Sequence, residues 1–255
     1  MHDLSGRKVL VTGSSKGIGA ATVRRLGEAG AYVIAHYSSD LHGAEAATSE
    51  IDKSRKLLLQ ADFASLQEVE GLWDTAVAKC GRIDVLVNNA AIMRWDGGFE
   101  QPLEVWDSVW EQTLAINVLA ASRLMRRAVQ HYLDNDGGTI ITLSSWAAQK
   151  GVTNPATIAY GASKAAIQAA TQTIARAFAK QGILAYVLAP GVVRTRLSEE
   201  FAATQGGEDN VTRGLAMGEW VPPAEIGELI AFLATGRTRH LSGATLDING
   251  ASYVR

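Results

Sequence analysis

The segment Lys8-Val9-Leu10-Val11-Thr12-Gly13-Ser14-Ser15-Lys16-Gly17-Ile18-Gly19 joins a short apolar run to a glycine-rich turn. Apolar side chains then recur at helical spacing as far as Ala29, so the segment predicts a strand, a tight turn and a helix. Glycines in such a turn let the backbone approach a pyrophosphate, and the helix N-terminus offers free N–H groups. The spacing is G-x-x-x-G-x-G, not the commoner G-x-G-x-x-G, and alone it is equally typical of an ordinary turn.

Strand-like and helix-like segments alternate along the rest of the chain. Apolar runs typical of strands follow at 32–35, 56–60, 85–87, 139–143, 184–188 and 245–248. Helical patterns are found near 43–51, after a capping box at Ser65, and at 106–133, 159–180 and 224–233, whereas 192–220 looks irregular. Strands that are apolar on both faces predict a parallel sheet covered by helices on both sides. We expect an α/β protein, a single doubly wound Rossmann-type domain over 1–255 with seven parallel strands.

Composition excludes several classes of function. The net charge of −2 and the absence of basic runs argue against binding to nucleic acid or to a membrane surface. The single cysteine, Cys80, excludes a disulfide framework, and no apolar run reaches the roughly 18 residues of a membrane span. The first residues show no targeting pattern, so we expect a soluble cytoplasmic protein. The five histidines are scattered without ligand-like spacing, and we expect no catalytic metal.

The end of the second expected strand bears on the choice of nucleotide. A carboxylate there would bind the ribose hydroxyls of NAD and repel a 2′-phosphate. The chain has His36, Tyr37, Ser38 and Ser39 instead, and Lys16 in the glycine turn adds a cation. This pattern favours NADP. The alternative is that these residues are solvated and that Asp40 reaches back to serve NAD.

Tyr160 and Lys164 form a Y-x-x-x-K pair, with Ser145 upstream at the end of an expected strand. Residues four apart lie on one face of a helix, so the phenol and the ammonium are neighbours. A free tyrosine titrates near about 10, but a positive charge nearby favours the phenolate and lowers that pKa. The pair alone is more often a surface tyrosine beside a lysine. Ser145, delivered to the same edge of the sheet, favours a catalytic site.

With these motifs in order, the chain resembles the short-chain dehydrogenase/reductase family over nearly its whole length. Thr12–Gly19 match T-G-x-x-x-G-x-G, and Asn88-Asn89-Ala90-Ala91 match N-N-A-G except at the last position. Asn117 falls at the helix asparagine of the family, and the segment Pro190–Thr195 matches P-G-x-x-x-T.

The resemblance implies a role for each matching residue. Tyr160 is the general acid or base, Lys164 holds the nicotinamide ribose and lowers the pKa of the phenol, and Ser145 orients the substrate oxygen. Asn117 holds a water that relays protons to Lys164. The residues implied for NADP, or for NAD as the second choice, are Gly13, Ser15, Lys16, Gly17, Ile18, Gly19, His36, Tyr37, Ser38, Ser39, Asp62, Phe63, Asn89, Ala90, Tyr160, Lys164, Pro190, Gly191, Val193 and Thr195.

The expected function is hydride transfer between NAD(P) and a carbonyl or secondary alcohol. An NAD-linked sugar or polyol dehydrogenase and a non-catalytic nucleotide sensor are the alternatives. Substrate contacts are expected from Arg94, Trp95, Ser145 and Trp146, and the segment 192–220 is expected to form a lid. The tryptophans are equally consistent with packing, and the segment with a surface loop. The family resemblance also implies a homotetramer.

Overall fold

The computed structural model describes residues 2–254, so the outermost residues of the expected domain, 1 and 255, lie outside it. Seven strands form one parallel sheet in the order β3-β2-β1-β4-β5-β6-β7. The strands are β1 (Lys8–Val11), β2 (Tyr32–Tyr37), β3 (Lys56–Gln60), β4 (Val85–Asn88), β5 (Gly138–Leu143), β6 (Ile183–Pro190) and β7 (Thr245–Ile248). The expected α/β sheet is confirmed. The strand order reverses direction between β1 and β4, which is where doubly wound folds bind ligands.

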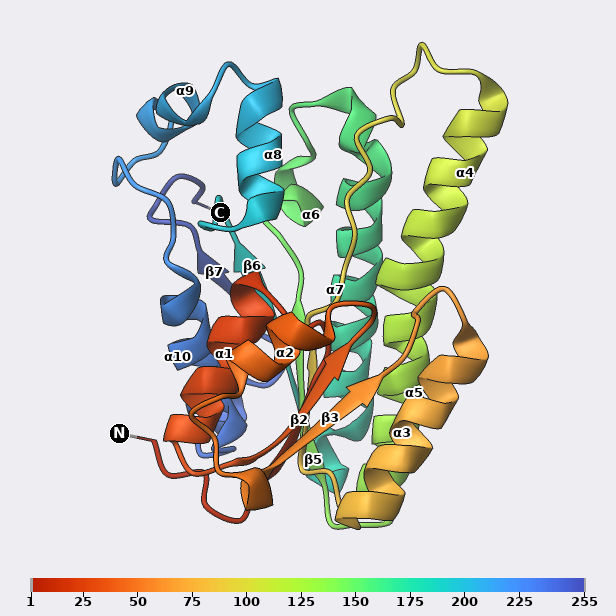
Figure 1. The fold of residues 1–255 in the computed structure, drawn as a ribbon, viewed down its shortest axis with the longest axis vertical. Coiled ribbons are helices and arrows are strands. Elements are labelled where there is room, and N and C mark those ends of the chain that lie inside the picture. The colour runs from red at the N-terminus through yellow and green to blue at the C-terminus, as the bar shows by residue number, and fades with distance from the viewer. Residues whose placement is uncertain (1, 255) are drawn as a thin grey trace.

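Alternation along each strand explains how both faces are buried. Val9 and Val11 contribute to one apolar cluster, whereas Leu10 contributes to the other. Figure 1 shows α1, α2 and α10 on one side of the sheet, and α3, α4, α5 and α7 on the other. The helices are α1 (Gly17–Glu28), α2 (Leu41–Ala47), α3 (Leu66–Cys80), α4 (Leu103–Leu114), α5 (Ala121–Leu133), α6 (Ala147–Lys150), α7 (Ile158–Phe178), α8 (Arg196–Thr204), α9 (Glu208–Arg213) and α10 (Pro223–Ala234).

The helical stretch expected over 106–133 is confirmed, and it contains one π-helical segment. Between α4 and α5 the chain makes a π-helical segment, η2 (Ala115–Ala120), which contains Asn117. A π segment adds one residue to a turn without interrupting the apolar pattern, so helical periodicity does not reveal it. Such segments occur frequently at functional sites.

The segment 192–220 is more regular than the sequence indicated. It contains α8 and α9, separated by Gly206 and Gly207, which both have positive φ. Buried Trp220 forms a small apolar cluster of its own with Val192 and Ala202. In Figure 1 these two helices lie over the carboxyl end of the sheet. Their shortness and the glycines between them explain why the pattern looked irregular.

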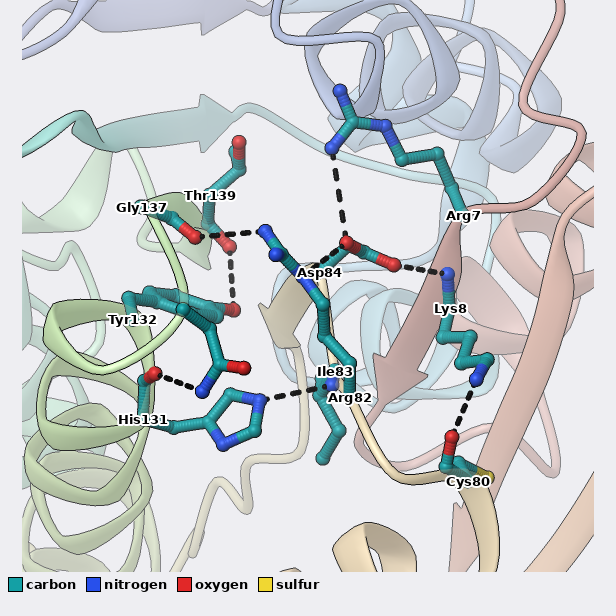
Figure 2. Close-up of polar contacts among 11 residues, drawn as sticks. Arg7, Lys8, Cys80, Arg82, Ile83, Asp84, His131, Tyr132, Gly137 and Thr139 are labelled. Carbon is teal, nitrogen blue, oxygen red and sulfur yellow. Dashed lines mark hydrogen bonds and ion pairs between the residues drawn. The ribbon is translucent and has the colours of Figure 1, made fainter.

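At the amino-terminal end of the strands, a polar network surrounds Asp84 (Figure 2). Its carboxylate accepts a hydrogen bond from the backbone N–H of Lys8 at 2.8 Å and forms an ion pair with the Arg82 Nε at 2.8 Å. Nearby, the His131 Nε2 accepts a hydrogen bond from the Ile83 N–H at 3.1 Å, and burial lowers the pKa of this imidazole. The network joins β1, β4 and α5 far from the carboxyl edge.

Within residues 2–254, every helix is too short or too polar to cross a lipid bilayer.

Candidate active site

The glycine turn connects β1 to α1 at the reversal in strand order. Gly13 and Gly17 have φ values of +68° and +55°, which favour glycine. A Cβ on Gly19 would lie 2.0 Å from the Gly13 carbonyl oxygen, so no larger residue fits there. Over the described part of the chain, no side chain caps the first turn of α1, where Lys16 is the N-cap residue. The N–H groups and dipole of this helix end are therefore available to an anion.

Residues after β4 brace this turn. The Thr12 Oγ1 accepts hydrogen bonds from the N–H groups of Asn89 at 2.9 Å and Ala90 at 3.0 Å. The Asn89 Nδ2 donates in return to the carbonyls of Thr12 at 2.8 Å and Gly13 at 3.1 Å. The structure thus brings Asn89 and Ala90 to the glycine turn, where the Asn89 amide holds the turn itself. Thr12 is a positioning residue that the list of expected site residues lacked.

The side chains of His36 and Phe63, two of the residues expected at the cofactor, are buried beneath the glycine turn, and their contact with a cofactor stays a prediction. The His36 Nδ1 accepts a hydrogen bond from the Gly13 N–H at 3.1 Å, and its Nε2 lies 3.0 Å from the Ala61 carbonyl. The ring stacks on Phe63 with centroids 4.3 Å apart, and both residues are buried. Burial lowers the pKa of His36 to about 4, so the imidazole is neutral. The neutral His36 side chain supports the glycine turn through its hydrogen bond to Gly13 and offers no positive charge to a bound phosphate.

The other residues after β2 and β3 present different surfaces. Lys16, Ser38 and Ser39 are exposed, and Tyr37 is half-buried. The Asp40 Oδ1 accepts from the Gly43 N–H at 2.8 Å and caps α2, while the Ser15 Oγ donates to the Asp40 carbonyl at 2.7 Å. The carboxylate that was the alternative ligand for NAD is thus engaged in capping.

Asp62 shapes the loop that follows β3. Its Oδ1 accepts from the Ala64 N–H at 2.9 Å, and its own N–H donates to the Glu68 carboxylate at 2.7 Å. Ser65 caps α3 as expected, because its Oγ accepts from the Glu68 N–H at 3.2 Å. The contact of Asp62 with adenine stays a prediction.

Ser145, Tyr160 and Lys164 come together at the carboxyl end of β5. Ser145 follows this strand, and the other two lie one turn apart near the start of α7. The Ser145 side chain acts on the Tyr160 phenol and lowers its pKa. The Lys164 Nζ lies 5.6 Å from the centre of the Tyr160 ring and donates to the Leu143 carbonyl at 2.8 Å. Ser144 adds a bond from its Oγ to the Lys164 carbonyl at 3.0 Å, which fixes α7 against β5.

Burial controls the electrostatics of this group. It raises the pKa of Tyr160, and the hydrogen bond from Ser145 offsets part of this rise. It also lowers the pKa of Lys164 to about 8. The expected lowering of the phenol pKa therefore does not follow from the Lys164 charge alone. The second positive charge in the expected site is that of an oxidised nicotinamide.

Asn117 fixes the loop after β4 to α7. Its Nδ2 donates to the Ile92 carbonyl at 2.9 Å and to the Ser163 Oγ at 3.0 Å, and its Oδ1 accepts from the Ile92 N–H at 2.8 Å. Both amide hydrogens are thus used, and the residue is buried. Asn117 acts in the structure as a positioning residue, and its water relay stays a prediction.

A cavity of about 110 Å³ opens beside the Ser145 and Tyr160 hydroxyls, and we call it the active-site cavity. Ser145, Trp146 and Tyr160 form part of its wall. The rest of the wall is largely apolar and comes from Met93, Ala147, Lys150, Gly151, Val152, Thr153, Thr157, Gly191, Val192, Leu197, Ser198 and Phe201. The arrangement can hold a polar oxygen between Ser145 and Tyr160 while apolar groups surround the remainder of a ligand.

The segment after β6 lies against the glycine turn. A Cβ on Gly17 would approach the Thr195 Cγ2 to 3.1 Å, and one on Gly191 would approach the Asn249 Cβ to 2.7 Å. Val193 makes an isolated parallel bridge with Val221. Pro190, which ends β6, therefore starts a segment that closes the crevice between the turn and the cavity.

Comparison with known proteins agrees with this geometry. A family model described as enoyl-(acyl carrier protein) reductase matches residues 13–251. The chain belongs to the short-chain dehydrogenase/reductase family. It is 34% identical to 3beta-hydroxysteroid dehydrogenase 1 of Eggerthella lenta, over 97% of this chain and 94% of that protein. It is 30% identical to glucose 1-dehydrogenase 2 of Bacillus subtilis, over 97% and 95% of the two chains.

Among solved structures, the chain resembles 3-ketoacyl-(acyl-carrier-protein) reductase from Brucella melitensis complexed with NADH. The TM-score is 0.87 at 26% identity, over 99% of this chain and 100% of that one. As a short-chain dehydrogenase/reductase, the protein is an NAD(P)-dependent oxidoreductase that acts on CH–OH or C=O groups.

Two of the expected substrate residues of this short-chain dehydrogenase/reductase do not line the active-site cavity, as far as residues 2–254 define it. Arg94 forms an ion pair with Asp96 and donates to the Gln112 Oε1 at 2.7 Å. Trp95 stacks on Phe201, with ring centroids 6.3 Å apart. Arg94 is thus neutralised by its own loop, and Trp95 supports the wall from behind Phe201.

Lys150 lines the cavity although the sequence analysis did not select it. The spacing from Trp146 could have indicated it, because residues four apart lie on one face of a helix. The described residues contain no group of three or more His, Cys, Asp or Glu side chains arranged to hold a metal ion.

Proposed function

We propose that this oxidoreductase transfers hydride reversibly between NADP(H) and a ketone or secondary alcohol whose body is largely apolar. The observation that supports the proposal is the Tyr160 phenol, which lies with Ser145 at the wall of a cavity and has the buried Lys164 ammonium 5.6 Å from its ring centre. Bound NAD(P) supplies the hydride or accepts it. The residues of the chain bind the reactants, orient them and move the proton.

The glycine turn fits the pyrophosphate of such a cofactor. The uncapped N-terminus of α1 presents N–H groups and a positive dipole end, and the hydroxyl of Ser15 lies in the same turn. Thr195 approaches the turn from the other side of the crevice. In the proposed site Lys164 binds the nicotinamide ribose, and the segment from Pro190 to Thr195 lies along the nicotinamide.

The proton moves through Tyr160. In reduction, Ser145 donates a hydrogen bond to the carbonyl oxygen, and the Tyr160 phenol gives up its proton to that oxygen as the alcohol forms. The positive charge of Lys164 then stabilises the phenolate. In oxidation the phenolate removes the proton from the alcohol. Because burial raises its pKa, the phenol carries the proton that the acid role requires. A positive nicotinamide ring nearby favours the phenolate that the base role requires.

Exposed cations and hydroxyls support the choice of NADP. The carboxylate that follows β2 is that of the exposed Asp40, and its Oδ1 accepts a hydrogen bond from the Gly43 N–H at the start of α2. Lys16, Ser38 and Ser39 are exposed in the same region. The Lys16 ammonium and the two serine hydroxyls can bind a 2′-phosphate, and the Lys16 charge offsets repulsion by the Asp40 carboxylate. We expect kcat/KM to be at least about tenfold higher with NADPH than with NADH, and Lys16→Ala to reduce this ratio.

The test follows NADPH or NADH oxidation with a panel of ketones. Equal or greater turnover with NADH would contradict the NADP assignment. Tyr160→Phe should abolish turnover while NADP(H) still binds, as calorimetry would show. If full activity survived in this variant, the protein would use another acid.

The second candidate is an NAD-linked sugar or polyol dehydrogenase. The name of the Bacillus subtilis relative and the NADH in the Brucella structure favour it. The apolar wall of the active-site cavity disfavours it, because a sugar would leave its hydroxyls without partners against Met93, Val152 and Phe201. Oxidation of glucose or sorbitol with NAD, measured in the same assay, separates the two.

We also propose that the segment 192–220 acts as a lid. Leu197 and Phe201 of α8 form one wall of the cavity. The cavity, about 110 Å³, is smaller than the roughly 150 Å³ site that accepts benzene. A movement of α8 would widen the cavity for a larger ketone and would cover the ketone once it is bound. Hydrogen exchange in 196–213 should therefore slow when both cofactor and ketone are bound.

A homotetramer in the cytoplasm completes the proposal. Phe99, Leu103 and Leu119 are at least half exposed, near or on the α4–η2 helical segment. Apolar side chains so placed favour burial against another copy. Sedimentation analysis of the purified protein tests the tetramer.

A further inference from the structure

The active-site cavity carries one positive charge that the proposed chemistry does not use. Among the described residues that line it, Lys150 is the only one with a formally charged side chain at neutral pH. The walls around it are apolar or hold hydroxyl groups. Apolar walls do not solvate a charge, so a cation among them favours a ligand of opposite charge.

The position of the ammonium is defined by an aromatic ring. Lys150 ends α6, one turn after Trp146, and its Nζ lies 3.7 Å from the centre of the Trp146 ring. The Tyr253 ring is 5.9 Å away on the C-terminal segment. The ammonium is thus held at the wall of the cavity and does not extend freely into solvent. Lys150 is exposed as a whole and also lines the cavity.

The carboxylates on neighbouring elements are bound elsewhere. Glu200 of α8 accepts from the Arg196 Nε at 2.9 Å and from the Trp95 Nε1 at 3.4 Å. Asp247 of β7 accepts a hydrogen bond from the Gln149 side chain at 3.4 Å. Over residues 2–254, Lys150 forms no ion pair within 4.0 Å. Its charge is therefore available to a ligand in the cavity.

We propose that Lys150 binds a carboxylate on the substrate, at a point remote from the carbon that exchanges hydride. The substrate class is then a keto acid or hydroxy acid with an apolar body between its two polar ends. The reacting oxygen lies at Ser145 and Tyr160, the apolar body lies against Trp146, and the carboxylate meets the Lys150 ammonium. This inference rests on the proposed function, because it assigns the second end of the same substrate.

Two physical arguments favour this assignment. A carboxylate that enters an apolar cavity loses hydration, and an opposite charge at the wall compensates for that loss. Burial also lowers the pKa of Lys150, so the ammonium is destabilised when the cavity holds no anion. A carboxylate relieves this destabilisation, whereas a neutral substrate does not. The Lys150 ammonium on the face of the indole ring therefore favours anionic ketones over neutral ones.

The test compares keto acids with their methyl esters. The probes are 4-oxopentanoate, 5-oxohexanoate and 4-acetylbenzoate, each beside its methyl ester, with NADPH oxidation as the readout. The acid and the ester have the same ketone but differ in charge, so the ratio of their kcat/KM values isolates the contribution of the carboxylate. We expect the wild-type protein to favour the acid in at least one pair. Lys150→Met should lower that acid-to-ester ratio by on the order of 10- to 100-fold.

Further variants separate binding of the anion from a structural role. Lys150→Glu should invert the preference, and Lys150→Arg should retain most of it, because the charge persists. Lys180→Met, at an exposed lysine beyond the end of α7, is the matched control and should leave the ratio unchanged. Added salt should weaken the preference in the wild-type protein.

The outcomes distinguish this inference from the function on which it rests. If neutral ketones are reduced through Tyr160 but no acid exceeds its ester, and Lys150→Glu leaves the ratio unchanged, the role of Lys150 is refuted and the proposed reduction stands. If no ketone of either kind is reduced, both proposals fail. Loss of activity toward acids and esters alike in Lys150→Met and Lys150→Arg would show a structural role and would also overturn the inference.

Discussion

Acidification should weaken the fold through His36, the imidazole beneath the glycine turn. In the folded chain burial lowers its pKa from 6.5 to about 4. The ring Nδ1 accepts a hydrogen bond from the Gly13 N–H. Protonation would place a hydrogen on that acceptor and a charge in the core. The unfolded chain has no such restriction and takes up the proton near pH 6.5. The perturbation is therefore a fall in pH from 7 to 4.

The sign and size follow from linkage. Because the folded pKa is depressed, the stability from this group is complete above about pH 6.5 and is lost as the pH falls toward 4. Each unit of pKa difference corresponds to about 1.4 kcal/mol, so the full loss is about 3 kcal/mol, of which about 2 kcal/mol is lost by pH 5. This is a large fraction of a typical free energy of unfolding.

Urea unfolding at several pH values measures the effect, with His36→Gln as the variant. At each pH, the free energy of unfolding of the variant is subtracted from that of the wild type. This difference should be about 2 kcal/mol smaller at pH 5 than at pH 7. His131, whose pKa is also lowered, is present in both proteins and cancels in the difference. His42→Gln is the control, since the His42 side chain is 98% exposed. If the difference in free energy of unfolding between the wild type and His36→Gln were the same at pH 5 and pH 7, protonation of His36 would not destabilise the fold.

Three further predictions concern other parts of the molecule. Gly19→Ala should weaken NADP(H) binding by more than about tenfold in calorimetry, because its Cβ would lie 2.0 Å from a carbonyl of the turn, whereas Gly71→Ala on α3 should leave binding unchanged. In the pH profile of ketone reduction, kcat/KM should fall above about pH 8 as Lys164 loses its proton, and a profile flat to pH 10 would contradict this role. Asp84→Asn should lower the free energy of unfolding by about 1–2 kcal/mol, because two partly exposed arginines lose their ion-pair partner. Urea unfolding at pH 7 measures this loss. A change below a few tenths of a kcal/mol would show that the network in Figure 2 does not stabilise the fold.

The sheet could be predicted because its signal is physical and local. Runs of Val, Ile and Leu bounded by polar turns have few alternatives in a chain of this size. The catalytic set could also be predicted, since Tyr160 and Lys164 are one helical turn apart and Ser145 ends a strand at the same edge. These features depend on spacing alone and not on how side chains meet across the fold.

Features that depend on contacts between distant segments were missed or misassigned. His36 reads as a polar residue at a strand end, yet alternation along β2 places it on the same face as Ile34, which packs in the cluster that also contains Phe63. That alternation was available in the sequence and would have shown the ring pointing into the core. The π segment at Asn117 left no such signal, because one extra residue in a turn does not alter an apolar pattern.

The cations near the site show why residue type alone does not identify a ligand-binding group. Arg94 was the expected anion contact, but Asp96 lies two residues away in the same loop and neutralises it. Lys150 was not expected, yet its loop supplies no acid and its ammonium rests on an indole ring at the cavity wall. The two differ in their partners and not in their charge. A charged side chain is available to a ligand only when the fold leaves it without an internal partner, so the choice between the two requires the structure. The comparison of keto acids with their esters therefore tests whether Lys150, which has no ion-pair partner among residues 2–254, binds the carboxylate that Arg94, paired with Asp96, does not bind.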